Sequence, residues 1–335
     1  WNIVKRKATV EKIELKDANG RAVEDETEVA NLLAKHFEDK VNKLKQEPEA
    51  DQIIEVMRDH YCDIQGWDIK EVTEREVAKL IDSLPSKTSC GSDGISYRLI
   101  KQLKFEVMQP LTIIINNSIK SGRFPSQWKK ARVVPIWKRK GSKTNVDSYR
   151  PIALTSSMGR LLERAVREQI QFHLEKQDIL PPNLHGFRKG CSTASAINEV
   201  MDLVKDARAK KKKVMLVALD ASAAFDVIQR PLLIQNLEII GAGRRTTQWY
   251  RSYLNDRSSQ VEVGAGSSEE WTSETGVIQG GALSPDNYNV MSISQPLWLR
   301  RTHEDVPTIV YADDGLAVVF GDTVKEYEIK AQAVA

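Results

Sequence analysis

The sequence has few of the features that mark secreted, zinc-bound or membrane proteins. Its only cysteines among 335 residues are Cys62, Cys90 and Cys191, odd in number and far apart. This spacing argues against a disulfide framework and a Cys-x-x-Cys zinc site, and favours a reducing intracellular compartment. No apolar run approaches the ~20 residues of a membrane helix, and Trp1–Lys7 does not resemble a signal peptide. We therefore expect an intracellular protein without membrane contact.

Other absences concern organisation. The sequence contains no internal repeat and no low-complexity linker, and it lacks an initiator methionine, so we expect it to start inside a larger reading frame. A net charge of +3, with 41% hydrophobic and 28% charged residues, is ordinary for a globular protein. The length suits two or three subdomains rather than one small core.

Two adjacent carboxylates stand between two apolar segments. Asp313 and Asp314 follow Thr308–Tyr311 and precede Leu316–Phe320. Such runs around an Asp-Gly step predict a β-hairpin, and at its turn neighbouring side chains can face one cleft. Unneutralised, the two carboxylates would repel each other, so the pair indicates a hard divalent cation such as Mg²⁺. An ordinary solvated turn is the alternative.

A third carboxylate ends a predicted buried strand. Val214–Leu219 is a continuous apolar run, and Asp220 follows it directly. A carboxylate in this position is costly unless its charge is compensated. If the hairpin pairs beside this strand, Asp220, Asp313 and Asp314 form a cluster for two cations. Two metals roughly 3.5 to 4 Å apart are the usual device for in-line phosphoryl displacement.

A glycine-containing loop, Gly276–Leu283, leads into a predicted helix at Ser284-Pro285. Read alone, it is a loop-to-helix junction. In this order and spacing, however, the three segments resemble the A, B and C motifs of the palm of reverse transcriptases. The resemblance is greatest to the enzymes of non-LTR (LINE-class) retrotransposons, and it covers about residues 83–320. Three upstream segments extend it: Gly91–Ile95, Tyr149–Leu154 and His185–Thr193.

The resemblance implies an α+β polymerase fold shaped as a right hand, with fingers, an antiparallel palm sheet packed by helices, and little or no thumb. It also implies an RNA-directed DNA polymerase that extends a DNA 3′-hydroxyl by two-metal nucleotidyl transfer. Asp220, Asp313 and Asp314 would be catalytic and would hold two Mg²⁺ or Mn²⁺ ions, with a backbone contact from Ala221. The implied partners are an RNA template, a DNA primer or nicked target DNA, and deoxynucleoside triphosphates. The family adds cytoplasm and nucleus as locations and allows an endonuclease domain in the parent polyprotein.

Phe225 lies five residues after Asp220, where the family places an aromatic ring against the sugar of the incoming nucleotide. A bulky ring excludes a ribose 2′-hydroxyl, so the product should be DNA. Asp226 is expected to point away, because adjacent strand positions alternate. Gln279 and Gly280 would approach the nucleotide and template, since glycine allows close backbone passage.

A basic segment with interleaved tryptophans precedes Arg150. Lys129–Lys143 contains no acidic residue and includes Trp137, a combination that suits nucleic acid or nucleotides, although a solvated charged face is the usual origin of a lysine run. Arg150 is the candidate for the fingertip arginine over the incoming nucleotide. A lysine such as Lys138 or Lys140 should reach the γ-phosphate, but the spacing does not select between them.

The predicted organisation has four parts. Residues 1–85 form a helical extension, with an amphipathic stripe that includes His36 as a packed core residue and a capping box at Thr73–Glu76. Residues 86–210 form the fingers, 211–327 the palm, and 328–335 a tail too short for a thumb. The predicted strands cover 132–137, 214–219, 260–263, 309–312 and 316–320, the last four in the palm. The predicted helices cover 99–119, 159–175, 193–209, 245–255 and 284–299.

Other functions remain open at this level. A polymerase-derived RNA-binding scaffold without catalysis would not need the three carboxylates and the aromatic residue that persist here. A group II intron maturase or a telomerase would share the palm but would require further domains. Asp286 and Asn287 stand where apolar residues are common in the family, which raises the question of how the helix after Pro285 packs.

Overall fold

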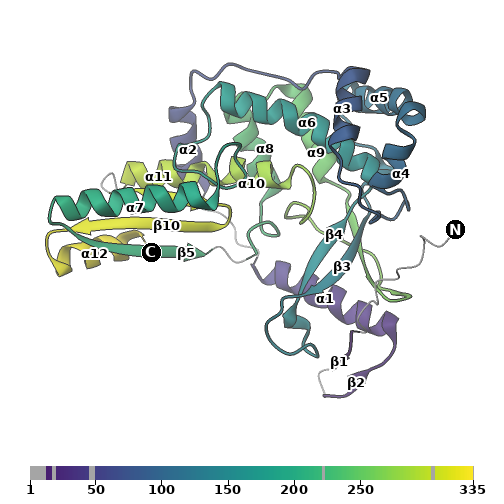
Figure 1. Cartoon of the computed structure of the whole chain (residues 1–335), viewed down its shortest axis with the longest axis horizontal. Helices are drawn as coiled ribbons and strands as arrows, with labels where there is room; N and C mark the ends of the chain where they lie inside the picture. Colours follow the sequence, from purple (N-terminus) through teal and green to yellow (C-terminus); the bar gives the residue numbers. More distant parts are fainter. Residues whose placement is uncertain (1–12, 17–19, 45–49, 221–222, 303–305, 335) are drawn as a thin grey trace.

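The computed structural model describes residues 13–16, 20–44, 50–220, 223–302 and 306–334. It has a mixed α/β architecture in which two separate sheets flank a helical core (Figure 1). Within the described residues, no helix has the length and apolar character needed to span a bilayer. The mixed α/β class expected from the sequence is confirmed.

The first sheet is antiparallel and consists of β5 (Lys213–Asp220), β10 (Asp314–Gly321) and β9 (Thr308–Tyr311), in the order β5-β10-β9. The central strand β10 pairs with β5 along its whole length. The predicted hairpin is therefore present and lies beside the predicted strand that ends on Asp220.

Two helices cover the faces of this sheet, α7 (Thr193–Ala209) and α12 (Val324–Val334), and Figure 1 shows them on opposite sides of β10. Val318 packs toward α7, whereas Ala317 packs toward α12, as strand alternation requires. Because α12 is continuous from Val324 to Val334, the expected boundary between residues 327 and 328 falls inside a helix that packs on the sheet.

The second sheet has five strands in the order β4-β3-β6-β7, with β8 also paired to β6. Its strands are β3 (Ala131–Trp137), β4 (Tyr149–Leu154), β6 (Ser258–Val263), β7 (Gly266–Ser267) and β8 (Trp271–Thr272). The prediction that residues 260–263 belong to the same sheet as 214–219 is wrong, because β6 pairs in parallel with β3. Alternation along a strand identifies its buried face but not the sheet that it joins.

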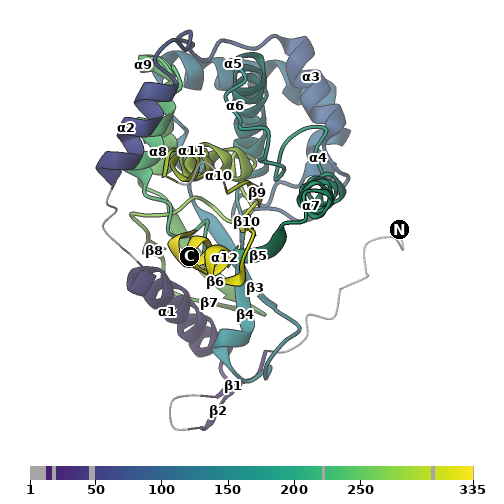
Figure 2. The same cartoon turned by 90° about the vertical axis from the view of Figure 1, so that its left-hand side faces the viewer.

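The helix α1 (Glu26–Leu44) covers the second sheet, and Figure 2 shows it beside β6 and β7. Its buried residues Leu33 and Phe37 belong to a core with Val133 and Val261. A short ribbon of β1 (Leu15–Lys16) and β2 (Ala22–Val23) precedes it. The N-terminal segment is therefore packed on the same sheet as β3 and β4.

The largest apolar core lies among the remaining helices. These are α2 (Ala50–His60), α3 (Glu74–Ser83), α4 (Tyr97–Gln102), α5 (Lys104–Ser121), α6 (Ser157–Lys176), α8 (Arg230–Ile239), α9 (Arg244–Leu254), α10 (Ser284–Ser292) and α11 (Ser294–Thr302). The capping box before α3 is confirmed. The helix predicted over 99–119 is two helices, since Leu103 leaves the helical region with φ −100° and ψ 25°. The helix predicted over 284–299 is likewise two, and α8 was not predicted.

The polar pair at the start of α10 is buried. Asp286 accepts a hydrogen bond from Arg167 Nε at 2.6 Å and another from Gln171 Nε2 at 2.8 Å. Burial raises the pKa of the Asp286 carboxyl, and the Arg167 cation opposes that effect. A buried charge requires a partner, and Arg167 on α6 provides one for Asp286. This pairing accounts for an acid at a position where the resemblance leads us to expect an apolar residue.

Candidate active site

The turn between β9 and β10 carries Asp313. Ala312 has a left-handed φ of 55°, which reverses the chain. Asp314 is the first residue of β10, and its backbone pairs with Tyr311 on one side and Asp220 on the other. Both Asp313 and Asp314 are exposed. The turn lies one residue before the expected Asp-Gly step, because pairing with β5 draws Asp314 into the strand.

The backbone register therefore places residues 220, 313 and 314 at the same end of the sheet, whereas the side chains of Asp313 and Asp314 line different pockets. Among the side chains that the structure describes, no three His, Cys, Asp or Glu are grouped closely enough to hold a metal. Ala221 and the side chain of Asp220, both predicted ligands, lie outside the described residues. The fit to a hard cation consequently rests on the register that sets Asp220 opposite Asp314 and on the oxygen donors of the set.

A segment that precedes α7 packs directly against the turn. Val310 N donates to Asn183 O at 2.9 Å, and His185 N donates to Val310 O at 2.8 Å. At Gly186, an added Cβ would lie 2.8 Å from Ala312 Cα and closer still to Ala312 N. Only glycine allows the two backbones to approach this closely. Gly186 therefore determines where the turn with Asp313 can lie.

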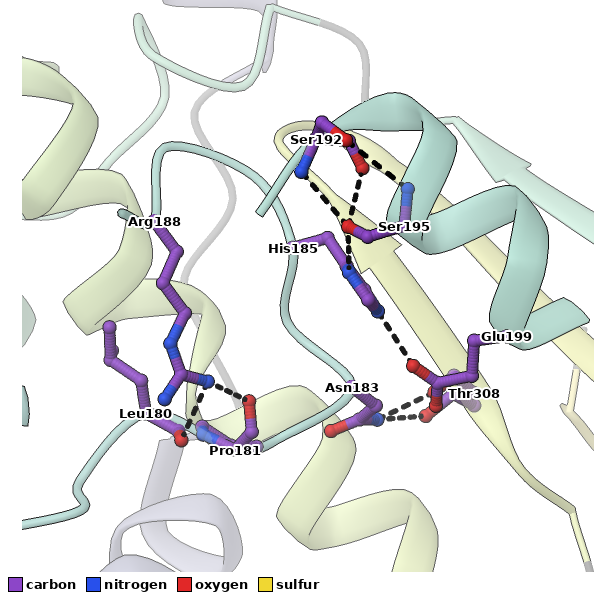
Figure 3. Close-up of polar contacts among 9 residues, drawn as sticks. All are labelled: Leu180, Pro181, Asn183, His185, Arg188, Ser192, Ser195, Glu199 and Thr308. Carbon is purple, nitrogen blue, oxygen red and sulfur yellow. Dashed lines mark hydrogen bonds and ion pairs between the residues drawn. The ribbon is translucent and has the colours of Figure 1, made fainter. Parts of the chain in front are cut away.

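The same segment is anchored to its surroundings (Figure 3). The two ring nitrogens of His185 contact Ser195 Oγ at 2.8 Å and Glu199 Oε2 at 2.7 Å, both on α7. Asn183 Nδ2 donates to Thr308 O at 2.6 Å. Arg188 donates to the carbonyl oxygens of Leu180 and Pro181, at 3.2 and 3.0 Å, which indicates a structural rather than a ligand-binding role.

A cavity of about 550 Å³ opens beside the turn. It is lined by strands of the second sheet, by Asp313 of the β9–β10 turn and by residues 223–226, which follow β5. It brings together five of the predicted site residues: Lys138, Arg150, Phe225, Gln279 and Asp313. Its size is within the range typical of small-molecule and cofactor sites. A pocket whose lining combines the carboxylates Asp226 and Asp313 with cations such as Lys138 and Arg150 suits a nucleotide.

Two predicted nucleotide-binding residues, Lys140 and Gly280, do not line this cavity, and neither does Asp314, which lines a separate pocket beside α7. Lys140 is exposed, whereas Lys138 faces the cavity and donates from Nζ to Asp147 O at 2.7 Å. Burial is the main cause of the lowered pKa of Lys138. Gly280 adopts a φ of 111° and passes the neighbouring strand β4, where an added Cβ would lie 2.9 Å from Ala153 O. Glycine is thus required there for backbone approach to β4.

Phe225 contacts two aromatic rings. Its ring centroid lies 5.1 Å from that of Tyr288 and 6.1 Å from that of Phe187. The prediction that Asp226 points away from the site is wrong, because Asp226 lines the cavity. Residues 223–226 form a turn, with Asp226 N donating to Ala223 O at 2.8 Å, so strand alternation does not apply to them. Burial raises the pKa of Asp226.

The loop Gly276–Leu283 links the parts of this cavity. Val277 N donates to Phe225 O at 2.9 Å, and Ala153 N donates to Gln279 O at 3.1 Å. The loop therefore joins the segment of Phe225 to strand β4, which carries Arg150. A displacement of the loop would move groups on both sides of the cavity.

Sequence reasoning missed the residue that holds the end of this loop. Glu163 is fully buried on α6, and its Oε2 accepts hydrogen bonds from Ala282 N at 2.6 Å and Leu283 N at 3.4 Å. These donors precede α10, where a negative charge is favourable. Burial raises the pKa of the Glu163 carboxyl, and the Arg257 cation partly offsets this. The only signal in the sequence is an acid among the buried apolar residues of one helix.

The raised pKa predicts a pH-dependent contribution to stability. A carboxyl whose pKa is higher in the folded state favours folding when it is protonated, and this contribution is lost as pH rises above the pKa of the unfolded state. We expect the unfolding free energy of the wild type, relative to Glu163→Gln, to fall as pH increases from about 4 to 7. Urea denaturation of both proteins across this range measures the difference. A difference that stays constant or rises with pH would contradict the assignment.

Comparison with known proteins gives an independent view of the chain. Residues 138–334 match the family model described as reverse transcriptase (RNA-dependent DNA polymerase). The chain is 29% identical to the RNA-directed DNA polymerase from mobile element jockey of Drosophila melanogaster, over 94% of this chain and 35% of that protein. It is 28% identical to the probable RNA-directed DNA polymerase from transposon BS of the same species, over 88% of this chain and 33% of the relative. The chain thus spans about a third of the length of the curated relatives it matches.

Proposed function

The chain belongs to the reverse transcriptase (RNA-dependent DNA polymerase) family, and from that premise we propose that it extends a DNA 3′-hydroxyl on an RNA template by two-metal nucleotidyl transfer. The observation that carries the proposal is the pairing of Asp314 with Asp220 beside a cavity lined by Asp313, Arg150 and Phe225. The similarity to polymerases of mobile elements supports the same activity, and the resemblance to non-LTR elements inferred from the sequence is confirmed.

In this proposal Asp220, Asp313 and Asp314, with the backbone of Ala221, hold the divalent cations, Mg²⁺ or Mn²⁺. When bound, cations of this kind would lower the pKa of the primer 3′-hydroxyl and neutralise charge on the triphosphate. Arg150 and Lys138 bind the phosphates of the incoming nucleotide, for which a planar guanidinium and a compact ammonium are both suited. Gln279 positions the nucleotide against the template, and Gly280 keeps the loop close to β4.

We also assign the parts of the polymerase hand within this proposal. The three-stranded sheet that carries Asp220 and Asp313 acts as the palm, and the sheet of β3 and β4 that carries Arg150 acts as part of the fingers. Because β6 pairs with β3, its residues 258–263 are assigned to the fingers sheet although they lie within the expected palm segment. The RNA template and the DNA primer, or nicked target DNA, would lie across the two sheets.

The sugar-selecting role of Phe225 provides the test of this function. We expect the wild type to incorporate deoxynucleotides on an RNA template in preference to ribonucleotides. Phe225→Val should raise the relative kcat/KM for ribonucleotides about tenfold or more, a change of roughly 1.4 kcal/mol, because the exclusion is steric. Single-nucleotide primer extension with each triphosphate measures this ratio, and thermal unfolding checks that the variant folds.

Asp226→Asn is the matched control, since Asp226 lines the same cavity one residue away. It should leave the ratio unchanged if the ring alone selects the sugar. Ribonucleotide preference in the wild type, or equal discrimination in the wild type and in folded Phe225→Val, would contradict the role of Phe225. A wild type that extends no primer on RNA would contradict the proposed function.

A further inference from the structure

The nucleotide cavity has a wall that lies outside the residues matched by the family model. The match starts at residue 138, yet His36, Phe37, Lys40 and Val41 of α1 line the cavity. Positions i, i+1, i+4 and i+5 of a helix lie on one face. One face of α1 therefore forms part of the cavity wall, although the apolar stripe in the sequence predicts His36 as a packed core residue.

This wall is held in place by contacts along α1. Ala265 N donates to Glu26 Oε2 at 2.7 Å near the start of the helix, and Glu269 N donates to Asn31 Oδ1 at 2.9 Å one turn later. Phe37 is 6% exposed and packs in the core beneath β3 and β6. These contacts position the helical turn that carries Lys40.

His36 adds a further contact between the helix and the rest of the wall. Its Nε2 lies 3.4 Å from Asp147 Oδ1, and the carbonyl oxygen of the same Asp147 accepts a hydrogen bond from Lys138 Nζ at 2.7 Å. Asp147 therefore joins the α1 face to Lys138, and Lys40 follows His36 by one helical turn. His36, Lys40 and Lys138 therefore belong to one continuous surface of the cavity.

Charge within this wall is balanced only in part: Asp226 and Asp313 line the same cavity, and the Lys40 cation lowers the pKa of Asp226 against the larger effect of burial. Arg230, another cavity residue, donates to the carbonyl oxygens of Gly276 and Thr275, both at 3.0 Å. In contrast, no hydrogen bond or ion pair joins the side chain of Lys40 or of Arg150 to another residue within the described ranges. Burial is the main cause of the lowered pKa of Lys138, and repulsion by the Lys40 cation lowers this pKa further. The cavity lining carries an excess of cations over its two carboxylates, Asp226 and Asp313; the cations are Lys40, Lys138, Arg150, Arg230 and Arg257. Such an excess suits a polyphosphate.

We propose that Lys40 binds the triphosphate of the incoming nucleotide together with Lys138 and Arg150, so that α1 completes the nucleotide site. This inference rests on the proposed polymerase function for its substrate. It assigns to the N-terminal helix a part in substrate binding and not only in packing. The ligand chemistry is a phosphate oxyanion, which the triphosphate or the RNA backbone could provide, and the two sources are separated below.

Kinetic comparison of three variants tests the inference. Lys40→Gln removes the charge, Lys40→Arg retains it, and Lys35→Gln removes an exposed charge from α1 at a position that does not line the cavity. We expect Lys40→Gln to raise KM for the deoxynucleotide about tenfold, with kcat changed less than about twofold, as loss of one charged hydrogen bond predicts. Lys40→Arg should recover most of the affinity, and Lys35→Gln should match the wild type.

Two binding measurements separate the phosphate sources and do not require turnover. Competition of inorganic triphosphate against a fluorescent deoxynucleotide should weaken about tenfold in Lys40→Gln, while affinity for a labelled RNA-DNA duplex stays unchanged. A lowered duplex affinity with unchanged triphosphate competition would overturn the proposal in favour of the RNA backbone. If the enzyme extends primers but Lys40→Gln and Lys35→Gln have the same KM for the deoxynucleotide and the same triphosphate competition, the proposal is overturned. A wild type that extends no primer would count against the proposed function instead. The role of Lys40 could still be tested, because triphosphate competition does not require primer extension.

Discussion

Asp313→Asn is expected to lower RNA-templated primer extension about 10³-fold or more, since metal stabilisation worth several kcal/mol is lost and each 1.36 kcal/mol changes the rate tenfold. Asp313 is exposed at the β9–β10 turn, so the substitution should leave folding intact. Asp220→Asn, at the end of the paired strand β5, should have an effect of the same size. Steady-state extension with saturating deoxynucleotide measures kcat for each variant.

Asp322→Asn is the matched control for this prediction. Asp322 is an exposed acid just after β10, so its loss changes the net charge equally without touching the proposed metal site. It should retain activity within about twofold of the wild type, as is usual for exposed positions away from specific contacts. Extension by Asp313→Asn at the wild-type rate would show that the carboxylate pair is an ordinary surface turn.

Gly186→Ala should be the second most damaging substitution, because the added methyl group meets backbone atoms. Its Cβ would lie 2.8 Å from Ala312 Cα and 3.0 Å from Tyr311 C, neither of which can rotate away. The turn with Asp313 must therefore move. Misplacement of a reacting group by about 1 Å can cost about 10²-fold in rate, and overpacking adds about 1 to 3 kcal/mol of destabilisation.

The measurement for this prediction combines kcat, triphosphate competition and thermal unfolding. We expect kcat to fall while affinity for inorganic triphosphate is retained, because Gly186 does not line the cavity. Gly66→Ala is the control, since a Cβ there meets one atom, Gly241 O, at an ordinary 3.7 Å. If folded Gly186→Ala has the kcat of Gly66→Ala, the contact between this segment and the turn does not control the position of Asp313.

The parts of the site that could be predicted from the sequence are those encoded in local patterns. The hairpin at Asp313 and the strand ending at Asp220 follow from apolar runs and turn residues, and the structure pairs them as expected. Arg150 follows from its motif and lines the cavity, whereas charge alone leaves Lys138 and Lys140 as equal candidates, of which only Lys138 lines it.

The remaining features depend on tertiary partners that no local pattern specifies. Strand β6 joins β3 because of long-range pairing, and Asp226 faces the cavity because the chain turns after β5 instead of continuing as a strand. Helical spacing shows which face of α1 is apolar, but not that its edge residue Lys40 borders a cavity built by β4 and the Gly276 loop. Gly186 belongs to the segment His185–Thr193 that carries the resemblance, but its steric contact with the turn depends on tertiary packing.

Metal-directed cleavage of the protein backbone tests the central claim most directly. Fe²⁺ bound in place of Mg²⁺ reduces added hydrogen peroxide to hydroxide and a hydroxyl radical, ascorbate returns the resulting Fe³⁺ to Fe²⁺, and the radicals cut the chain near the metal ligands. Because β5 and β10 set Asp220 opposite Asp314, we predict cleavage at two separate places, near residue 220 and near residues 313–314. Excess Mg²⁺ should suppress both cuts, and Asp313→Asn should abolish both together. Cleavage at only one of these places, or cuts that Mg²⁺ does not suppress, would contradict a shared metal site.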